Sequence, residues 1–176
     1  EFKDLQRSFL KAGVIDIEML SDHAIFSSLF KIRNQNRIKF VLSGTNYATE
    51  HGMPFSWIWP KMDRKNILSI HKIFGTKKLK SYPMMRYFKW ELMKRFNIGG
   101  EFIELLNHIN YSKSTAMYKL KEIFKWKYYG GKHYESKFTK FYQAYILPNK
   151  FSIDKRRVHL SALIRNGEIS RAAAEQ

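Results

Sequence analysis

Apolar residues recur every three or four positions in several stretches of the chain, which is the spacing of one helical face. Phe2, Leu5 and Phe9 share such a face at the start, and Gly13 is a suitable residue to end that helix. The same reasoning predicts helices over residues 2–12, 22–36, 64–74, 84–96, from Ser112 or Ser114 to 124, 137–147 and 155–165, with a short helix near the end of the chain.

Two of the predicted helices carry aromatic stripes that we expect to face the core. The stripe in residues 84–96 consists of Met85, Phe88, Leu92 and Phe96. The stripe in residues 137–147 consists of Phe138, Phe141, Tyr142, Tyr145 and Ile146. We expect Ser21 and Asp63 to cap the helices that follow them, and Pro148 to end the helix that precedes it.

Three short segments have the pattern of strands. Residues 14–18 alternate apolar and polar side chains, and residues 101–106 form a second candidate. Residues 38–43 predict a strand whose centre, from Phe40 to Leu42, is buried, with a loop opening at Gly44. An aromatic loop over residues 45–62 comes next. The order of helix, strand and glycine loop favours an α/β fold that is mostly helical, with two or three short strands in one compact unit over residues 1–176.

The composition narrows the classes of partner. Thirty-two Lys and Arg against 15 Asp and Glu give a net charge of +17, which favours an anionic partner. The chain has no cysteine, so thiolate metal sites, disulfides and a cysteine nucleophile are excluded within it. No apolar run approaches the roughly 20 residues of a membrane helix, so we expect no membrane insertion. No leader is recognised, and the expected compartment is the cytoplasm.

The first candidate site is the loop from Ser43 to Glu50, at the end of a predicted strand. Ligands bind outside the carboxyl ends of strands in open α/β sheets, and a glycine such as Gly44 lets the backbone approach a ligand. Asn46, Thr49 and Glu50 add an amide, a hydroxyl and a carboxylate that could bind Mg²⁺ or accept a proton. The alternative is an ordinary polar turn with an Asn cap.

The second candidate is the loop over residues 128–136, which precedes a predicted helix. Lys132 could hold a phosphate or a developing oxyanion, His133 could move protons and Glu135 could orient the histidine. The glycine spacing is not that of a Walker loop. The alternative is a capping loop with solvated charges.

Other charged segments have competing interpretations. Arg156, Arg157 and His159 lie in a basic first helical turn that could bind phosphate or be simply solvated. Asp22 and His23 could act as a pair or pack locally. The histidines lack metal-site spacing, so we predict no metal site. The basic and aromatic segment 76–98, which includes Arg86, Tyr87 and Trp90, supports the alternative of an RNA-binding module, although it contains no recognised reading motif.

Several runs resemble the N-acetyl sugar amidotransferase family, in order over essentially the whole chain. The most specific are Gly-Gly-Lys-His-Tyr-Glu-Ser at residues 130–136 and Asp-Lys-Arg-Arg-x-His-Leu-Ser at residues 154–161. The others are residues 2–10, 13–18, 22–25 and 42–50. The resemblance implies the C-terminal part of a Rossmann-like PP-loop domain, of the adenine nucleotide alpha hydrolase type. The Ser-Gly-Gly-x-Asp-Ser pyrophosphate loop of that family is absent, so we expect it upstream of Glu1.

The resemblance also implies a reaction. ATP activates the acetamido group of a nucleotide-linked sugar, and ammonia converts it to an acetamidino group in the synthesis of surface polysaccharide such as lipopolysaccharide O-antigen. Magnesium would be held mainly by the absent loop, and a glutaminase and a cyclase-like subunit would supply ammonia. Nucleic acid is not expected as a partner in this interpretation, and this chain alone is expected to be inactive.

Residue roles follow from the same resemblance. Lys132, Glu50 and His133 become the candidate catalytic residues. The candidate binding residues are Ser43, Gly44, Asn46, Thr49, Glu135, Arg156, Arg157 and His159. The interpretation requires that the loops around Asn46 and Lys132 converge on one cleft.

Overall fold

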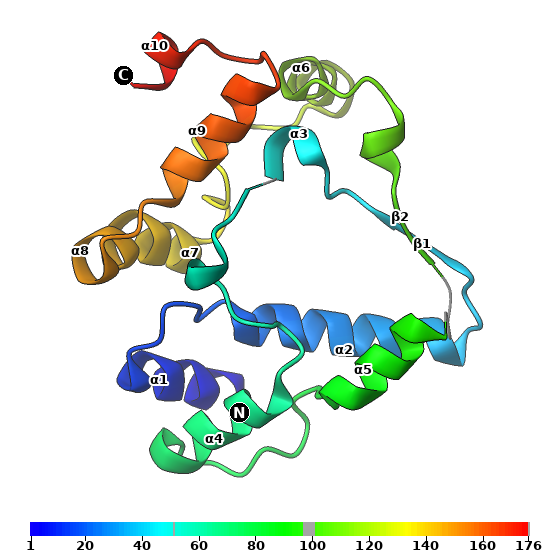
Figure 1. The fold of residues 1–176 in the computed structure, drawn as a ribbon, viewed down its shortest axis with the longest axis vertical. Coiled ribbons are helices and arrows are strands. Elements are labelled where there is room, and N and C mark those ends of the chain that lie inside the picture. Colours follow the sequence, from blue (N-terminus) through cyan, green and yellow to red (C-terminus); the bar gives the residue numbers. More distant parts are fainter. Residues whose placement is uncertain (51, 97–100, 176) are drawn as a thin grey trace. The chain divides into compact units, whose positions relative to one another are not determined.

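The computed structural model describes residues 1–50, 52–96 and 101–175 (Figure 1). The chain groups into two compact units. Unit 1 consists of Glu1–Val41 and Phe55–Phe102, and unit 2 of Leu42–Pro54 and Ile103–Gln176. The secondary structure is mostly helical with two short strands, which agrees with the α/β class.

Unit 1 is built from helices whose bounds largely follow local sequence signals. Gly13, at φ 66°, ends the first helix as predicted, and the side chain of Asp63 caps another by accepting a hydrogen bond from the Asn66 amide. The core of unit 1 includes Leu5 and Ile67, both fully buried. Its elements are α1 (Phe2–Ala12), α2 (Met19–Gln35), the short 3₁₀ helix η1 (Phe55–Trp57), α4 (Arg64–Phe74) and α5 (Tyr87–Arg95).

The prediction of a strand over residues 14–18 is wrong. These residues form turns, and α2 begins at Met19, so Ser21 lies inside the helix and does not cap it. Side-chain bonds hold the segment instead: Asp16 accepts hydrogen bonds from the Trp59 amide at 3.0 Å and from Lys61 Nζ at 2.7 and 2.9 Å. Alternation alone does not make a strand where a side-chain anchor replaces pairing with another strand.

The two strands are β1 (Phe40–Ser43) and β2 (Glu101–Glu104), which pair in parallel. Strands are therefore confirmed within the predicted ranges, but the predicted burial of β1 is wrong. Phe40 is 60% exposed and Leu42 is 67% exposed. A parallel strand is buried when helices cover both faces of a larger sheet, and a two-stranded ribbon cannot provide that cover.

The predicted stripe of the 84–96 helix is only partly correct. Met85 is buried, but it precedes the helix, while Phe88 and Phe96 are 72% and 63% exposed. The helix turns Met93 into the core of unit 1 and places Trp90 against Phe30. Two of the four stripe residues, Phe88 and Phe96, therefore face solvent, whereas Leu92 is partly buried.

Unit 2 contains the remaining helices. Of the two serines predicted to cap the 112–124 helix, Ser112 does so, since its side chain accepts a hydrogen bond from the Thr115 amide, and Asp154 caps a later helix by accepting from the Arg156 amide. The elements are α3 (Tyr47–Glu50), η2 (Leu105–His108), α6 (Lys113–Phe124), α7 (Lys137–Phe141), η3 (Tyr142–Ile146), α8 (Leu147–Phe151), α9 (Lys155–Arg165) and α10 (Arg171–Ala174). The predicted aromatic loop over residues 45–62 thus contains α3 and η1.

The prediction that Pro148 ends the 137–147 helix is wrong. The helix passes through a π turn, η3, and continues as α8 to Phe151. A proline is tolerated in the first turn of a helix, where its missing N–H is not needed. The π turn also rotates the stripe, so that Tyr142 is 3% exposed whereas Phe141 and Tyr145 are more than half exposed.

In the described ranges, no helix has both the length and the apolar character needed to cross a bilayer.

Candidate functional site

The two predicted loops meet within unit 2. The Nζ atom of Lys132 lies 3.0 Å from Oε1 of Glu50 and donates to the carbonyl oxygen of Thr49 at 3.4 Å. The Lys132 side chain is 22% exposed, so the ion pair is partly shielded from water. The loops that contain Glu50 and Lys132 are therefore in contact. That they line a single cleft stays a prediction.

The first loop is organised by its own polar side chains. Asn46 is buried, and its Oδ1 accepts hydrogen bonds from the amide and the hydroxyl of Thr49, at 2.9 and 3.1 Å. Its amide nitrogen donates to the carbonyl of Gly44 at 3.3 Å, and the Ser43 hydroxyl is 2.7 Å from that of Thr45. Asn46 thus caps α3, as the alternative interpretation of this loop proposed, and that cap presents the neighbouring Glu50 to Lys132.

The second loop contains an unusual backbone conformation. His133 has φ 64°, in the left-handed region that is uncommon for a residue with a side chain. Gly130 has φ 91°, and a Cβ atom at Gly131 would lie 2.8 Å from the Tyr134 ring. The loop is therefore tightly wound, and residues held in such conformations gather at functional sites.

The imidazole of His133 lies between a histidine and a carboxylate. Its ring centre is 6.2 Å from that of His159, and its Nδ1 is 4.0 Å from Oε1 of Glu135. The distance to Glu135 is too long for a hydrogen bond, so the predicted orienting role of Glu135 is not seen as a direct contact.

His159 is the centre of a cluster of positive charge. Helix α9, which carries it, packs against α3. The pKa of His159 is lowered to about 4, chiefly by burial and in addition by the charges of Lys132 and His133, with Lys155 and Lys113 contributing. The atom Nε2 of His159 is buried and has no hydrogen-bond partner in the part of the chain that the structure describes. A buried polar atom without a protein partner is costly, so this nitrogen is available to bond a ligand group.

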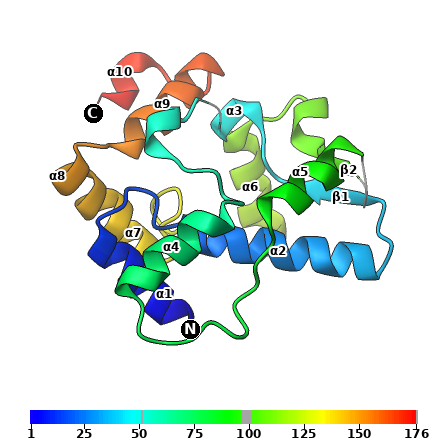
Figure 2. The same cartoon turned by 60° about the horizontal axis from the view of Figure 1, so that its bottom comes forward.

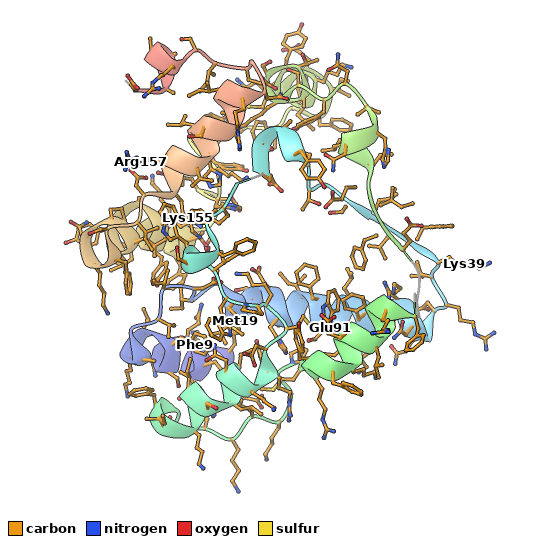
Figure 3. The ribbon with its side chains drawn as sticks, viewed as in Figure 1. Phe9, Met19, Lys39, Glu91, Lys155 and Arg157 are labelled. Carbon is orange, nitrogen blue, oxygen red and sulfur yellow. The ribbon has the colours of Figure 1, made fainter. Side chains whose placement is uncertain are left out.

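The two arginines near the start of α9 have different surroundings. Arg156 makes a two-pronged contact with its own cap, with Nε 2.9 Å and Nη2 2.7 Å from the Asp154 carboxylate. Figure 3 shows Lys155 and Arg157 at the start of α9. Arg157 is exposed and lies two positions from His159, which is about 200° around a helix. The structure therefore does not bring Arg157 to the face that carries His159.

Sequence reasoning missed some residues near this cluster. Lys113 contributes charge at His159 and starts α6, whose first amides donate to the carboxylate of Glu168. Arg165 lies beside Gly52, where a Cβ atom would come within 3.0 Å of the guanidinium. A basic residue after a serine cap is the only signal that Lys113 offers, and that pattern also occurs at ordinary helix starts.

The Asp22 and His23 pair belongs to unit 1 and is structural. His23 is fully buried, its Nδ1 donates to the Lys61 carbonyl at 2.8 Å, and its Nε2 accepts from the Met85 amide at 3.3 Å. Burial lowers the pKa of His23, which favours the neutral form that these two bonds require. The carboxylate of Asp22 pairs with Lys61 at 3.1 Å.

The described residues do not suit a magnesium ion. No group of three or more His, Asp or Glu residues gathers among them, and the Glu50 carboxylate faces Lys132. Magnesium prefers several oxygen ligands. No step of the proposed reaction is therefore assigned to a metal ion held by the described residues.

The charge cluster makes a prediction about His159. In a Lys132→Ala variant, the pKa of His159 should rise above its value of about 4, because a nearby cation that opposes protonation is removed. A proton NMR titration of the imidazole measures the shift, with Lys121→Ala, an exposed lysine of α6, as the control. An unchanged midpoint in the Lys132 variant would show that the two side chains do not interact.

The comparison with known families bears on the C-terminal part of unit 2. The family model described as LPS biosynthesis protein WbpG-like, C-terminal domain, matches residues 135–176. This match confirms the resemblance to the C-terminal portion of the N-acetyl sugar amidotransferase family over those residues. It includes Glu135, Arg156, Arg157 and His159, and it begins just after His133. No curated protein and no solved structure matches the chain.

Proposed function

From the match of residues 135–176 to a lipopolysaccharide-biosynthesis family, we propose that this chain is the C-terminal part of an ATP-dependent amidotransferase. Its substrate would be a nucleotide-linked acetamido sugar. The observation that carries the proposal is the ion pair between Glu50 and Lys132 beside the charge cluster at His159. Three segments distant in sequence thereby bring a lysine, a carboxylate and two histidines together in one unit.

The cluster has the charge that a phosphate-bearing substrate needs. Lys132, Lys155 and Lys113 all act on His159, and buried or partly buried cations attract anions more strongly than solvated ones. Nucleotide sugars and ATP are polyanions. A phosphate oxygen or sugar hydroxyl could bond the Nε2 atom of His159, which has no partner among the described residues.

The proposed roles follow from these positions. When ATP is bound, its AMP group would pass to the acetamido oxygen with release of pyrophosphate, and ammonia would then displace that oxygen as AMP. Lys132 would stabilise negative charge that develops during this exchange, as a positive point charge held by Glu50. His133 would accept or donate a proton, and Glu50 would accept one from the incoming ammonia. A glutaminase and a cyclase-like subunit remain the proposed source of ammonia.

The test is product formation with the upstream segment present. A chain extended by a segment with the Ser-Gly-Gly-x-Asp-Ser loop should release AMP and pyrophosphate only when ATP, ammonia and a UDP-linked acetamido sugar are all supplied. The 176-residue chain alone should release neither. The proposal would be contradicted if pyrophosphate were released equally well without the sugar, or if mass spectra showed the acetamido group unchanged.

A further inference from the structure

Unit 1 contains a pocket that shares no residue with the candidate site. Its volume is about 550 Å³, within the range of small-molecule sites. The lining comes from the residues just before α4, the first turn of α4, and the start of α5, two helices that Figure 2 shows from a second direction. Its principal residues are Pro60, Arg64, Lys65, Arg86, Tyr87 and Phe88.

The pocket has unneutralised positive charge. It holds three cations and one carboxylate, Asp63, which gives 3 − 1 = +2. Both oxygens of Asp63 are already used, since Oδ1 accepts from the Asn66 amide and Oδ2 from Trp59 Nε1, each at 3.0 Å. Within the described ranges, neither Arg64 nor Arg86 has an ion-pair or hydrogen-bond partner for its guanidinium. Such groups can bind phosphate with two parallel hydrogen bonds.

Aromatic rings stand beside these cations. Phe88 is 72% exposed and Tyr87 is 50% exposed, although both line the pocket. Glu91, one turn further along α5 (Figure 3), raises the pKa of Tyr87 by accepting from its hydroxyl and by its negative charge. Of the aromatic residues in the 76–98 segment, Trp90 is not available, because its ring packs on Phe30 at 4.6 Å.

We propose that this pocket binds a small ligand that joins a phosphate to a flat aromatic ring, as a nucleotide does. Arg64 and Arg86 would hold the phosphate, whose two negative charges match the +2 of the lining. The ring would stack on the exposed face of Phe88. A half-open pocket of about 550 Å³ has room for one small ligand, which favours a single molecule over a polymer that tracks along a surface. The inference does not rest on the proposed function, because the residues and the unit are different.

The test follows backbone amide shifts of residues 86–88 by NMR, so that it reports on this pocket and not on unit 2. The 176-residue chain is titrated with AMP and with phenyl phosphate. Inorganic phosphate probes the anion contact alone, and adenosine probes the ring contact alone. AMP and phenyl phosphate should both bind. Inorganic phosphate and adenosine should each bind at least about tenfold more weakly, since one of the two contacts is lost.

Matched variants locate the site. Arg86→Gln and Phe88→Ala change exposed side chains, and each should weaken AMP binding by about tenfold or more. Arg95→Gln and Phe96→Ala change an exposed cation and an exposed ring at the other end of α5, and should leave the affinity within about twofold. Circular dichroism confirms that each variant is folded.

Three results would overturn the inference. Inorganic phosphate could bind as tightly as AMP, which would indicate a general anion patch. The Arg95 and Phe96 variants could lose as much affinity as the pocket variants. An oligouridine strand could bind far more tightly than AMP with a steep dependence on salt, which would identify an RNA surface.

Discussion

Replacing Lys132 by alanine is expected to lower kcat by about 10²-fold or more in the proposed enzyme that includes the upstream pyrophosphate loop. The structure gives the reason: Lys132 joins the two candidate loops through Glu50 and the Thr49 carbonyl, and adds charge at His159. If it meets negative charge only in the transition state, its loss raises the barrier without weakening substrate binding to the same extent. Steady-state kinetics with the nucleotide-linked sugar measure kcat and KM separately.

Two further variants accompany this test. Glu50→Gln keeps the lysine but removes both the ion pair and the proposed proton acceptor, so it should also lower kcat. Lys121→Ala removes an exposed lysine of α6 and should leave kcat near that of the parent. A Lys132→Ala enzyme with unchanged kcat would reject the proposed role.

The signals that the sequence carries best are local ones. The helices at 2–12, 64–74 and 155–165 were predicted with the bounds that the structure has, because caps such as Asp63 and Asp154 act within one turn. Burial could not be predicted in the same way. Phe40 and Phe88 have core-like patterns and are exposed, because burial depends on which elements pack against them.

The candidate site shows the same difference between what local sequence patterns can predict and what depends on tertiary packing. Contact between the Asn46 and Lys132 loops followed from the family resemblance, since no local pattern links segments so distant in sequence. Helical periodicity alone could have separated Arg157 from His159, which are two positions apart. Lys113 could not have been found, because its part in the cluster depends on where α6 lies within unit 2.

Phe9→Ala is expected to cost unit 1 about 3–5 kcal/mol of unfolding free energy. Phe9, labelled in Figure 3, is 1% exposed on the face of α1, which packs on α4. Truncation removes the whole ring from a core that includes Leu5 and Ile67, both fully buried, and leaves a cavity that rigid helices only partly fill. The matched control is Phe55→Ala, because Phe55 is 91% exposed and should change stability by less than about 0.5 kcal/mol.

Urea unfolding can measure this loss in unit 1 separately from unit 2. Trp57, Trp59 and Trp90 belong to unit 1 and Trp126 to unit 2, so a Trp126→Phe background leaves a fluorescence signal from unit 1 only. In that background the Phe9 variant should show a lower midpoint with an unchanged slope, since the same surface is exposed on unfolding. If Phe9→Ala and Phe55→Ala shifted the midpoint equally, the packing of α1 on α4 could not be what stabilises unit 1, because only one of these two rings is buried there.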